Sequence, residues 1–150
     1  MLMNEILNFC SGVTPKIIRD QSYIFEEGSK TGIIVILIEG EIEVIKNGLS
    51  VAVLSEPGTI IGEVSVLQDC PHTATCRAQG DIKVYSFTNG KEFLLSNVNI
   101  LWLASRDLAK KLQLTTTCLT GFSKDIQNYS KFELNRQIDF VEEVVGTTSA

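Results

Sequence analysis

The stretch from Thr14 to Phe87 consists of short runs of β-branched and other apolar residues, and turn residues separate these runs. Such spacing is typical of short strands. The segment Gly32–Ile38 carries no polar side chain, which predicts a strand that is buried on both faces. The following segment, Glu41–Val44, alternates polar and apolar residues, as a half-buried strand does. The pattern therefore predicts an all-β roll over residues 14–87.

Turn signals divide this stretch into about eight strands. Asn47-Gly48 favours a tight type I′ hairpin, because both residues tolerate positive φ. Pro57-Gly58 marks another turn, and Thr73–Ala78 and Lys83–Phe87 are expected as the last two strands. The predicted fold class is mainly β with flanking α-helices: an eight-stranded β-roll, also described as a double-stranded β-helix or jelly roll.

Helical patterns flank the roll. Asn4–Phe9 predicts a short helix, Phe93–Leu95 a second one, and a longer helix is expected from Val98 to Thr117 or beyond. Its apolar positions recur every seven residues in two series: Leu101, Leu108, Thr115 and Phe122, and Leu112, Leu119 and Ile126. A partner helix could cover this stripe, which predicts a homodimer. The alternative is that the stripe docks on its own roll.

The expected domain of residues 1–120 leaves a short extension, residues 121–150, which is either helical or partly disordered. A winged helix-turn-helix domain needs more chain than these 30 residues. Their several acidic side chains also suit DNA phosphates poorly. We therefore expect no DNA binding.

The composition fits one globular domain without a membrane anchor. The net charge is −5, and the longest apolar run is far shorter than the roughly 20 residues of a membrane helix. No N-terminal stretch has the features of a secretion signal, so we expect a cytoplasmic protein that does not bind membranes. Four scattered cysteines and a single histidine lack zinc spacing, so no metal site is predicted. An iron–sulfur cluster on the four cysteines is a remote alternative.

The stretch from Gly62 to Thr75, with the sequence GEVSVLQDCPHTAT, indicates a small anion cradle. Gly62 allows a close backbone approach, and Glu63 to Leu67 can form a helical turn with free N–H groups. Val64 and Ser65 belong to the same turn. A carboxylate at Glu63 fits beside an anion only if it accepts a hydrogen bond from a ligand hydroxyl, such as the ribose 2′-OH.

This stretch resembles the phosphate-binding cassette of the cyclic-nucleotide-binding family, G-E-[LIV]-[AS]-L, a spacer and P-R-[TSA]-A-T. The match runs without a gap, and the resemblance extends over about residues 14–120. It implies a pocket for cAMP or cGMP formed by Gly62, Glu63, Val64, Ser65, His72 and Thr73. One departure stands out, because His72 occupies the position of the family arginine that grips the cyclic phosphate.

This exchange predicts weaker or altered binding. Arg presents a permanent charge and a two-pronged donor, whereas His is only partly charged at neutral pH. Loss of a charge-assisted pair costs about 1.5–3 kcal/mol, or roughly ten- to a hundredfold in affinity. Arg77 is too far along its strand to replace it, at about 17 Å from position 72.

Part of the long helix, Leu108–Thr116, resembles the dimerisation helix of the catabolite activator proteins. There, a Thr-Ser pair touches the purine, one member reaching across the dimer. The resemblance implies the same base-contacting role for Thr115 and Thr116. Three consecutive threonines are otherwise only a weak helix end.

Two functional hypotheses remain open at this stage. In the first, the chain is a regulatory sensor that binds cAMP or cGMP weakly, requires no cofactor and acts on an unknown downstream protein. In the second, the pocket has lost its ligand and the roll serves as a dimerising interaction module. Haem sensing through His72 or a cysteine is a third, weaker hypothesis. No catalytic arrangement or nucleotide-triphosphate loop is present, so we do not expect an enzyme.

Overall fold

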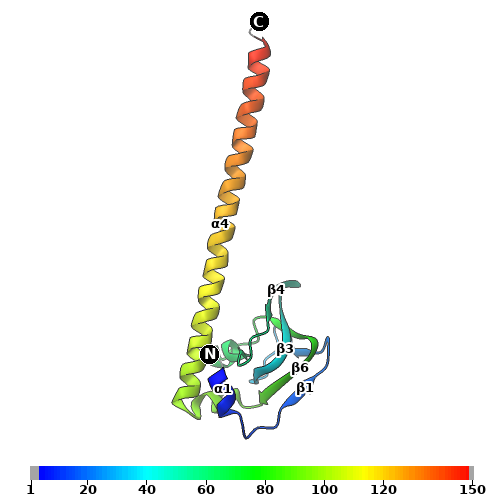
Figure 1. The fold of residues 1–150 in the computed structure, drawn as a ribbon, viewed down its shortest axis with the longest axis vertical. Helices are drawn as coiled ribbons and strands as arrows, with labels where there is room; N and C mark the ends of the chain where they lie inside the picture. Colours follow the sequence, from blue (N-terminus) through cyan, green and yellow to red (C-terminus); the bar gives the residue numbers. More distant parts are fainter. Residues whose placement is uncertain (1–3, 149–150) are drawn as a thin grey trace. The chain divides into compact units, whose positions relative to one another are not determined.

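The structure is a computed structural model that describes residues 4–148. It comprises two compact units, residues 1–108 and 109–150, and each is described here by itself. The first unit holds a β-roll and short helices, and the second is helical (Figure 1). The two units divide within one helix. The domain boundary after residue 120, expected from the sequence, stays a prediction.

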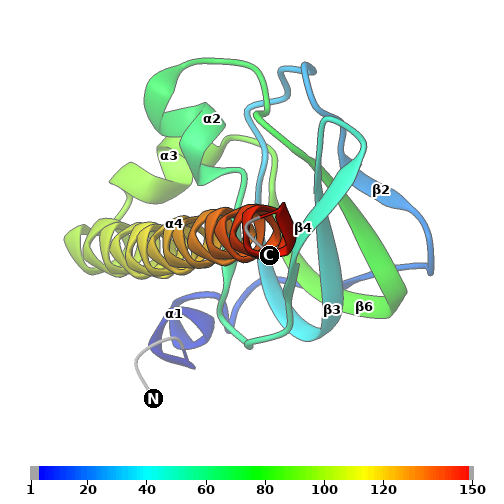
Figure 2. The same cartoon turned by 90° about the horizontal axis from the view of Figure 1, so that it is seen from above.

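Within the described residues, six strands form one antiparallel sheet in the order β1-β6-β3-β4, with β2 paired to β6 and β5 paired to β3. The strands are β1 (Lys16–Ile18), β2 (Tyr23–Phe25), β3 (Ile34–Lys46), β4 (Leu49–Leu54), β5 (Ile60–Ile61) and β6 (Thr75–Phe87). The ladder between β3 and β6 is the longest, running from Ile34–Phe87 to Ile45–Thr75. Figure 2 shows these two strands beside each other, with β4 next to β3.

The predicted mainly β class with flanking helices is confirmed, but the count of eight strands is wrong. Gly32–Ile38 and Glu41–Val44 were expected as separate strands, and so were Thr73–Ala78 and Lys83–Phe87. Each pair is one bent strand of 13 residues, β3 or β6. The bends fall at Gly40 and Gly80, which have φ of 104° and 76°. Because both strands bend at facing positions, their ladder continues through register shifts and does not end there.

Four helices accompany the sheet in residues 4–148: α1 (Asn4–Phe9), α2 (Glu63–Gln68), α3 (Gly90–Leu95) and α4 (Val98–Thr148). α3 begins at Asn89, whose side chain accepts a hydrogen bond of 3.1 Å from the N–H of Glu92. α4 is longer than the sequence suggested. It continues as one helix to Thr148. Residues 149–150 of the predicted extension lie outside the described residues.

β3 supplies both hydrophobic cores of the first unit. Ile34 and Ile36 pack with α1, α3 and the start of α4, whereas Val35 and Leu37 pack inside the roll. All four are at most 2% exposed, which confirms a strand buried on both faces. At its far end, Asn47 and Gly48 have φ of 50° and 77°, which confirms the type I′ conformation. β4, on the outer side of the ladder, presents three apolar side chains to solvent: Leu49, Val51 and Val53.

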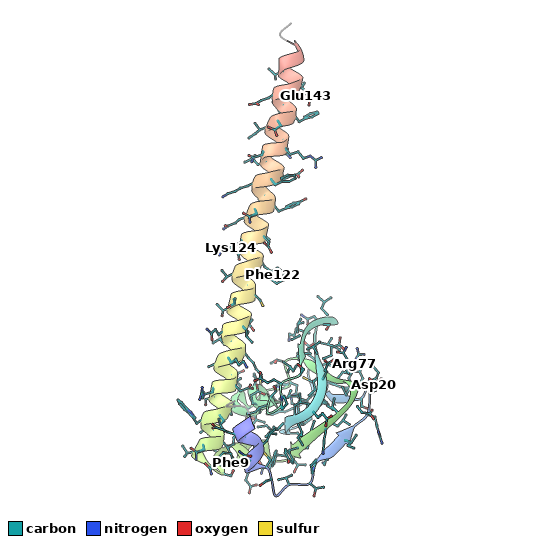
Figure 3. All side chains as sticks on the ribbon, in the orientation of Figure 1. Phe9, Asp20, Arg77, Phe122, Lys124 and Glu143 are labelled. Atoms are coloured by element: carbon teal, nitrogen blue, oxygen red, sulfur yellow. The ribbon has the colours of Figure 1, made fainter. Side chains whose placement is uncertain are left out.

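In the second unit, α4 exposes large apolar side chains along its length. One series follows the 3-4 spacing of a coiled coil: Leu112, Thr115, Leu119, Phe122, Ile126 and Tyr129. We call this series the proximal stripe. Its large members are 62–69% exposed. Lys124 projects away from the side that carries Phe122 (Figure 3). Beyond Tyr129 the spacing restarts out of phase at Leu134, Ile138, Val141 and Val145.

The bends at Gly40 and Gly80 give a matched pair of substitutions. A Cβ on Gly40 would lie 2.7 Å from Ile82 Cγ2 and 3.1 Å from the Asp81 carbonyl oxygen, whereas a Cβ on Gly80 meets open space. Gly80→Ala should cost about 1–2 kcal/mol, the left-handed penalty alone. Gly40→Ala should cost about 1–3 kcal/mol more, because the added atom overpacks the bend. Urea unfolding followed by fluorescence of Trp102, at the start of α4, measures both. Equal losses in the two variants would contradict the steric argument.

Candidate functional site

Gly62 joins β5 to α2, and its position admits no side chain. The residue has φ of 91°, and a Cβ there would lie 2.4 Å from the Ile33 carbonyl oxygen. The same atom would lie 3.0 Å from Phe25 Cζ. The sequence attributed this glycine to a close approach to a ligand. The structure shows a close approach to the protein itself: the backbone of Gly62 rests on Phe25 and on the loop before β3.

Glu63, Val64 and Ser65 form the first turn of α2, where backbone N–H groups have no acceptor within the helix. Glu63 is 3% exposed and Ser65 is 4% exposed, while Val64 is half-buried. The Ser65 hydroxyl donates to the carbonyl oxygen of Cys70, and the Cys70 N–H donates back to the Ser65 carbonyl at 3.0 Å. Ser65 therefore closes the turn that follows α2. Its hydroxyl is engaged within the protein.

His72 lies in the interior, 5% exposed, and its ring is held on two sides. It stacks on Phe25 with ring centroids 4.1 Å apart and an angle of 19° between the planes. Its Nε2 lies 2.7 Å from the Thr31 hydroxyl oxygen. Burial lowers the pKa of His72 below its ordinary value, because the charged form loses water. The imidazole is therefore neutral at pH 7.

The backbone of His72 is held as firmly as its ring. Its N–H donates to the Ser29 carbonyl, and its own carbonyl accepts from the Gly28 N–H, both at 2.8 Å. The loop that carries Gly28, Ser29 and Thr31 thus forms three hydrogen bonds with His72. Phe25 lies against both Gly62 and His72, so the two ends of the cassette pack on the same side chain.

Two lysines that sequence reasoning missed bind the cassette backbone. Lys46 donates to the carbonyl oxygen of Thr73, whose side chain is exposed. Lys30 Nζ lies 3.2 Å from the Asp69 carbonyl oxygen and 2.8 Å from Asp69 Oδ1. No motif spacing signals either contact. The β3–β6 register, which pairs Ile45 with Thr75, would have placed Lys46 beside the cassette.

Each of these lysines also has a carboxylate partner. Lys46 Nζ lies 2.9 Å from Glu27 Oε1, and the Asn47 N–H donates to Glu27 Oε2 at 3.1 Å. These hydrogen bonds, with that of Lys46 the strongest, lower the pKa of Glu27. The hydrogen bond and charge of Lys30 lower the pKa of Asp69 in the same way. Both carboxylates are therefore ionised at neutral pH.

Arg77, Thr115 and Thr116 have hydrogen-bond partners outside the cassette. Arg77 is engaged with Glu43, through Nη2 at 2.6 Å and Nε at 3.2 Å from Oε2. Thr115 and Thr116 lie in α4, in the unit of residues 109–150, with exposed side chains. Their hydroxyls donate to the carbonyls of Lys111 and Leu112, each at 2.9 Å. This is the usual bonding of a helical threonine to the preceding turn.

The four cysteines are free thiols, and two of them lie in different cores: Cys10 among the helices and Cys76 inside the roll. Burial raises the pKa of the Cys10 thiol to about 11, so this thiol is protonated and inert. Residues 4–148 hold no group of three or more metal-ligating side chains. None of the helices in that range has an apolar stretch that could cross a bilayer.

The profile of the cyclic nucleotide-binding domain family matches residues 15–94, which include the whole cassette. Solved structures share the fold. A regulatory subunit of a cAMP-independent protein kinase A from Trypanosoma cruzi, bound to guanosine, is 24% identical with a TM-score of 0.50. That match covers 55% of this chain, which spans only 29% of the kinase subunit.

Two bacterial structures cover more of the chain. The catabolite activator protein of Thermus thermophilus is 18% identical with a TM-score of 0.63, over 80% of this chain and 59% of that one. A cyclic nucleotide-binding domain from Methylobacillus flagellatus is 26% identical with a TM-score of 0.54, over 76% and 66%. With the profile match over more than half of its length, the chain belongs to the cyclic nucleotide-binding domain family.

Proposed function

We propose that this chain is a regulatory sensor module that binds cAMP or cGMP weakly, at the cassette from Gly62 to Thr73. The observation that carries the proposal is the buried Glu63 in the first turn of α2, within a family-matched cassette. The resemblance to the family implies that a carboxylate at this position binds the ribose hydroxyl of the ligand. The module acts in the cytoplasm on a downstream protein, without catalysis, cofactor, DNA or membrane.

Weak binding follows from the state of His72. A neutral imidazole that stacks on Phe25 and binds Thr31 gives a cyclic phosphate no permanent charge. The loss of the charge-assisted pair supplied by arginine is about 1.5–3 kcal/mol. A base-contacting role for Thr115 and Thr116 is also proposed, on the resemblance to the dimerisation helix of the catabolite activator proteins.

A second candidate is a module without a ligand. It is favoured by the internal hydrogen bond of Ser65 to Cys70 and by the tight hold on His72. Both would have to be compatible with a bound phosphate for sensing to occur. In this case the roll would serve interaction and dimerisation alone.

We also propose a homodimer through the proximal stripe. Thr115, Thr116, Thr117 and Gly121 are poor helix formers, yet α4 is continuous through them. Helices with such residues depend on packing of an apolar face. The stripe offers five large apolar side chains per copy, and a pair of stripes would bury on the order of 1,000 Å², enough for a specific contact.

The first prediction concerns the missing arginine. His72→Arg should tighten cAMP or cGMP binding by about ten- to a hundredfold, because it restores a permanent two-pronged donor. Isothermal titration calorimetry on both proteins measures the change. His72→Gln is the neutral control and should bind no more tightly than the wild type. If His72→Arg folds but neither it nor the wild type binds, the ligand-free module is the correct alternative.

The second prediction is the pH dependence of cyclic-nucleotide binding. Burial lowers the pKa of His72 in the free protein, and a nearby phosphate raises it in the complex. The complex then takes up a proton, so affinity must rise as pH falls from about 8 to 6. Glu27 and Asp69, whose pKa values are lowered, stay ionised over this range. Titrations of the wild type in this range should show the trend, and His72→Arg should flatten it.

The third prediction tests the dimer. Leu112→Glu together with Leu119→Glu should give monomers in sedimentation velocity, because two like charges per copy would face each other in the seam. Leu114→Glu with Gln127→Glu adds the same two charges off the stripe and should leave the dimer intact. A wild type that sediments as a monomer at high concentration would show the proposal to be wrong.

A further inference from the structure

We infer that the groove between α2, α3 and the first turns of α4 is a docking site for an acidic amphipathic helix of the downstream protein. The inference deepens the proposed function, because it names the surface through which the module acts and the kind of partner that this surface takes. It rests on three features of the first unit: the lining of the groove, the exposed apolar side chains beside it, and the charges at its rim.

The groove is open to solvent and is lined by apolar side chains. α2 and α3 pack beside each other (Figure 2), and a groove of about 310 Å³ lies between them and the start of α4. Its apolar lining comes from all three helices: Val66, Leu67, Leu94, Leu95 and Leu101. Leu94 is 2% exposed and belongs to the core beside the helices. Leu67 and Leu95, in contrast, are 49% and 66% exposed, so a partner can reach them.

The exposed apolar surface continues from the groove onto α4. Val98 precedes Leu101 by three residues and Trp102 by four, so these side chains are neighbours on the helix surface. Val98 is 78% exposed and Trp102 is 64% exposed. Contiguous exposed apolar surface marks an interaction site, and tryptophan is a frequent anchor of such sites. A small molecule in the groove would leave Val98 and Trp102 in water, whereas a protein segment covers both.

The secondary structure of the site favours a helical partner. All five apolar lining residues lie in helices, so the groove offers side chains and not the edge of a sheet. Extended peptides commonly bind by adding a strand to such an edge. A helix instead binds a groove through apolar side chains at positions i, i+3, i+4 and i+7. The occupant that fits is therefore an amphipathic helix.

The charges that line the groove leave its rim positive. Its charged lining residues are Lys91 and Asp69. Asp69 is paired with Lys30 at 2.8 Å, and Lys91 attracts the same carboxylate, so one negative charge faces two positive ones. Glu92, the acidic residue of α3, is engaged at the start of that helix, where Asn89 Nδ2 donates to Glu92 Oε2 at 3.1 Å.

A further cation lies along the same side of α4. Arg106 follows Trp102 by four residues, and both side chains are exposed. Together with Lys91, Arg106 places positive charge beside the apolar surface, in a chain whose net charge is −5. This arrangement complements a helix with acidic flanks. It disfavours a second copy of the same surface, because like charges would meet.

The test uses the full chain and two synthetic helical peptides of about 18 residues, or five turns. Both carry leucine along one face, and the residues that flank this face are glutamate in one peptide and lysine in the other. Trp102, the single tryptophan, reports docking, because its emission shifts to the blue when it loses contact with water. The acidic peptide should give this shift and bind at least about tenfold more tightly than the basic one. No shift with either peptide, or equal affinities, would overturn the inference.

Substitutions locate the binding site on the chain. Leu95→Glu should weaken binding of the acidic peptide by about tenfold or more, whereas Leu114→Glu, the same exchange at another exposed helical position, should leave it unchanged. Lys91→Glu should reverse the preference between the two peptides, and Lys124→Glu should not. Unchanged binding in both groove variants would contradict the assignment. The comparison of the peptides uses the wild type, so it holds even if a variant fails to fold.

Two further measurements separate this inference from other assignments. Assembly of the wild type beyond the dimer in sedimentation velocity, if Leu95→Glu abolishes it, would identify a second copy as the occupant and overturn the inference. Calorimetry with cAMP and cGMP tests sensing separately. Cyclic-nucleotide binding without peptide docking would overturn the inference and leave the proposed function standing. Docking without cyclic-nucleotide binding would support the groove and overturn the sensor.

Discussion

The pairing of β3 with β6 is the contact on which the first unit depends. The two strands stay paired from Ile34–Phe87 to Ile45–Thr75, across the bends at Gly40 and Gly80. In this ladder, β3 contributes apolar side chains both to the core beside the helices and to the core inside the roll. It also fixes where β6 begins, and therefore where the cassette, which directly precedes β6, lies against the rest of the roll.

Phe25 links that framework to the site. The Phe25 ring lies beside the backbone of Gly62 and also stacks on the imidazole of His72. The two ends of the cassette therefore pack on the same apolar side chain. The buried, neutral imidazole of His72 stacks on this support and brings no permanent charge to the cassette.

Sequence periodicity was sufficient for the fold class and for the cassette as a local unit. Gly62 to Ser65 come together because they are adjacent along the chain, and α2 follows from their helical pattern. Contacts across the sheet were not predictable in the same way. The hold of Thr31 on His72 and of Lys46 on Thr73 depends on tertiary register, which local pattern does not encode. The strand count failed for the same reason, since a bend and a strand end share the same glycine signal.

The position of β6 has a consequence for how the chain folds. The β3–β4 hairpin is local and closes at Asn47-Gly48, an event of microseconds. The pairing of β6 with β1 joins residues that are far apart in the sequence, such as Lys16 and Val84, so closure of the roll is slower. Closure also cannot be completed until residue 87 has been synthesised. Until then the hairpin stands without β6, and the edge of β3 that β6 covers in the finished roll is unpaired. During that interval the nascent chain is most exposed to strand-to-strand aggregation.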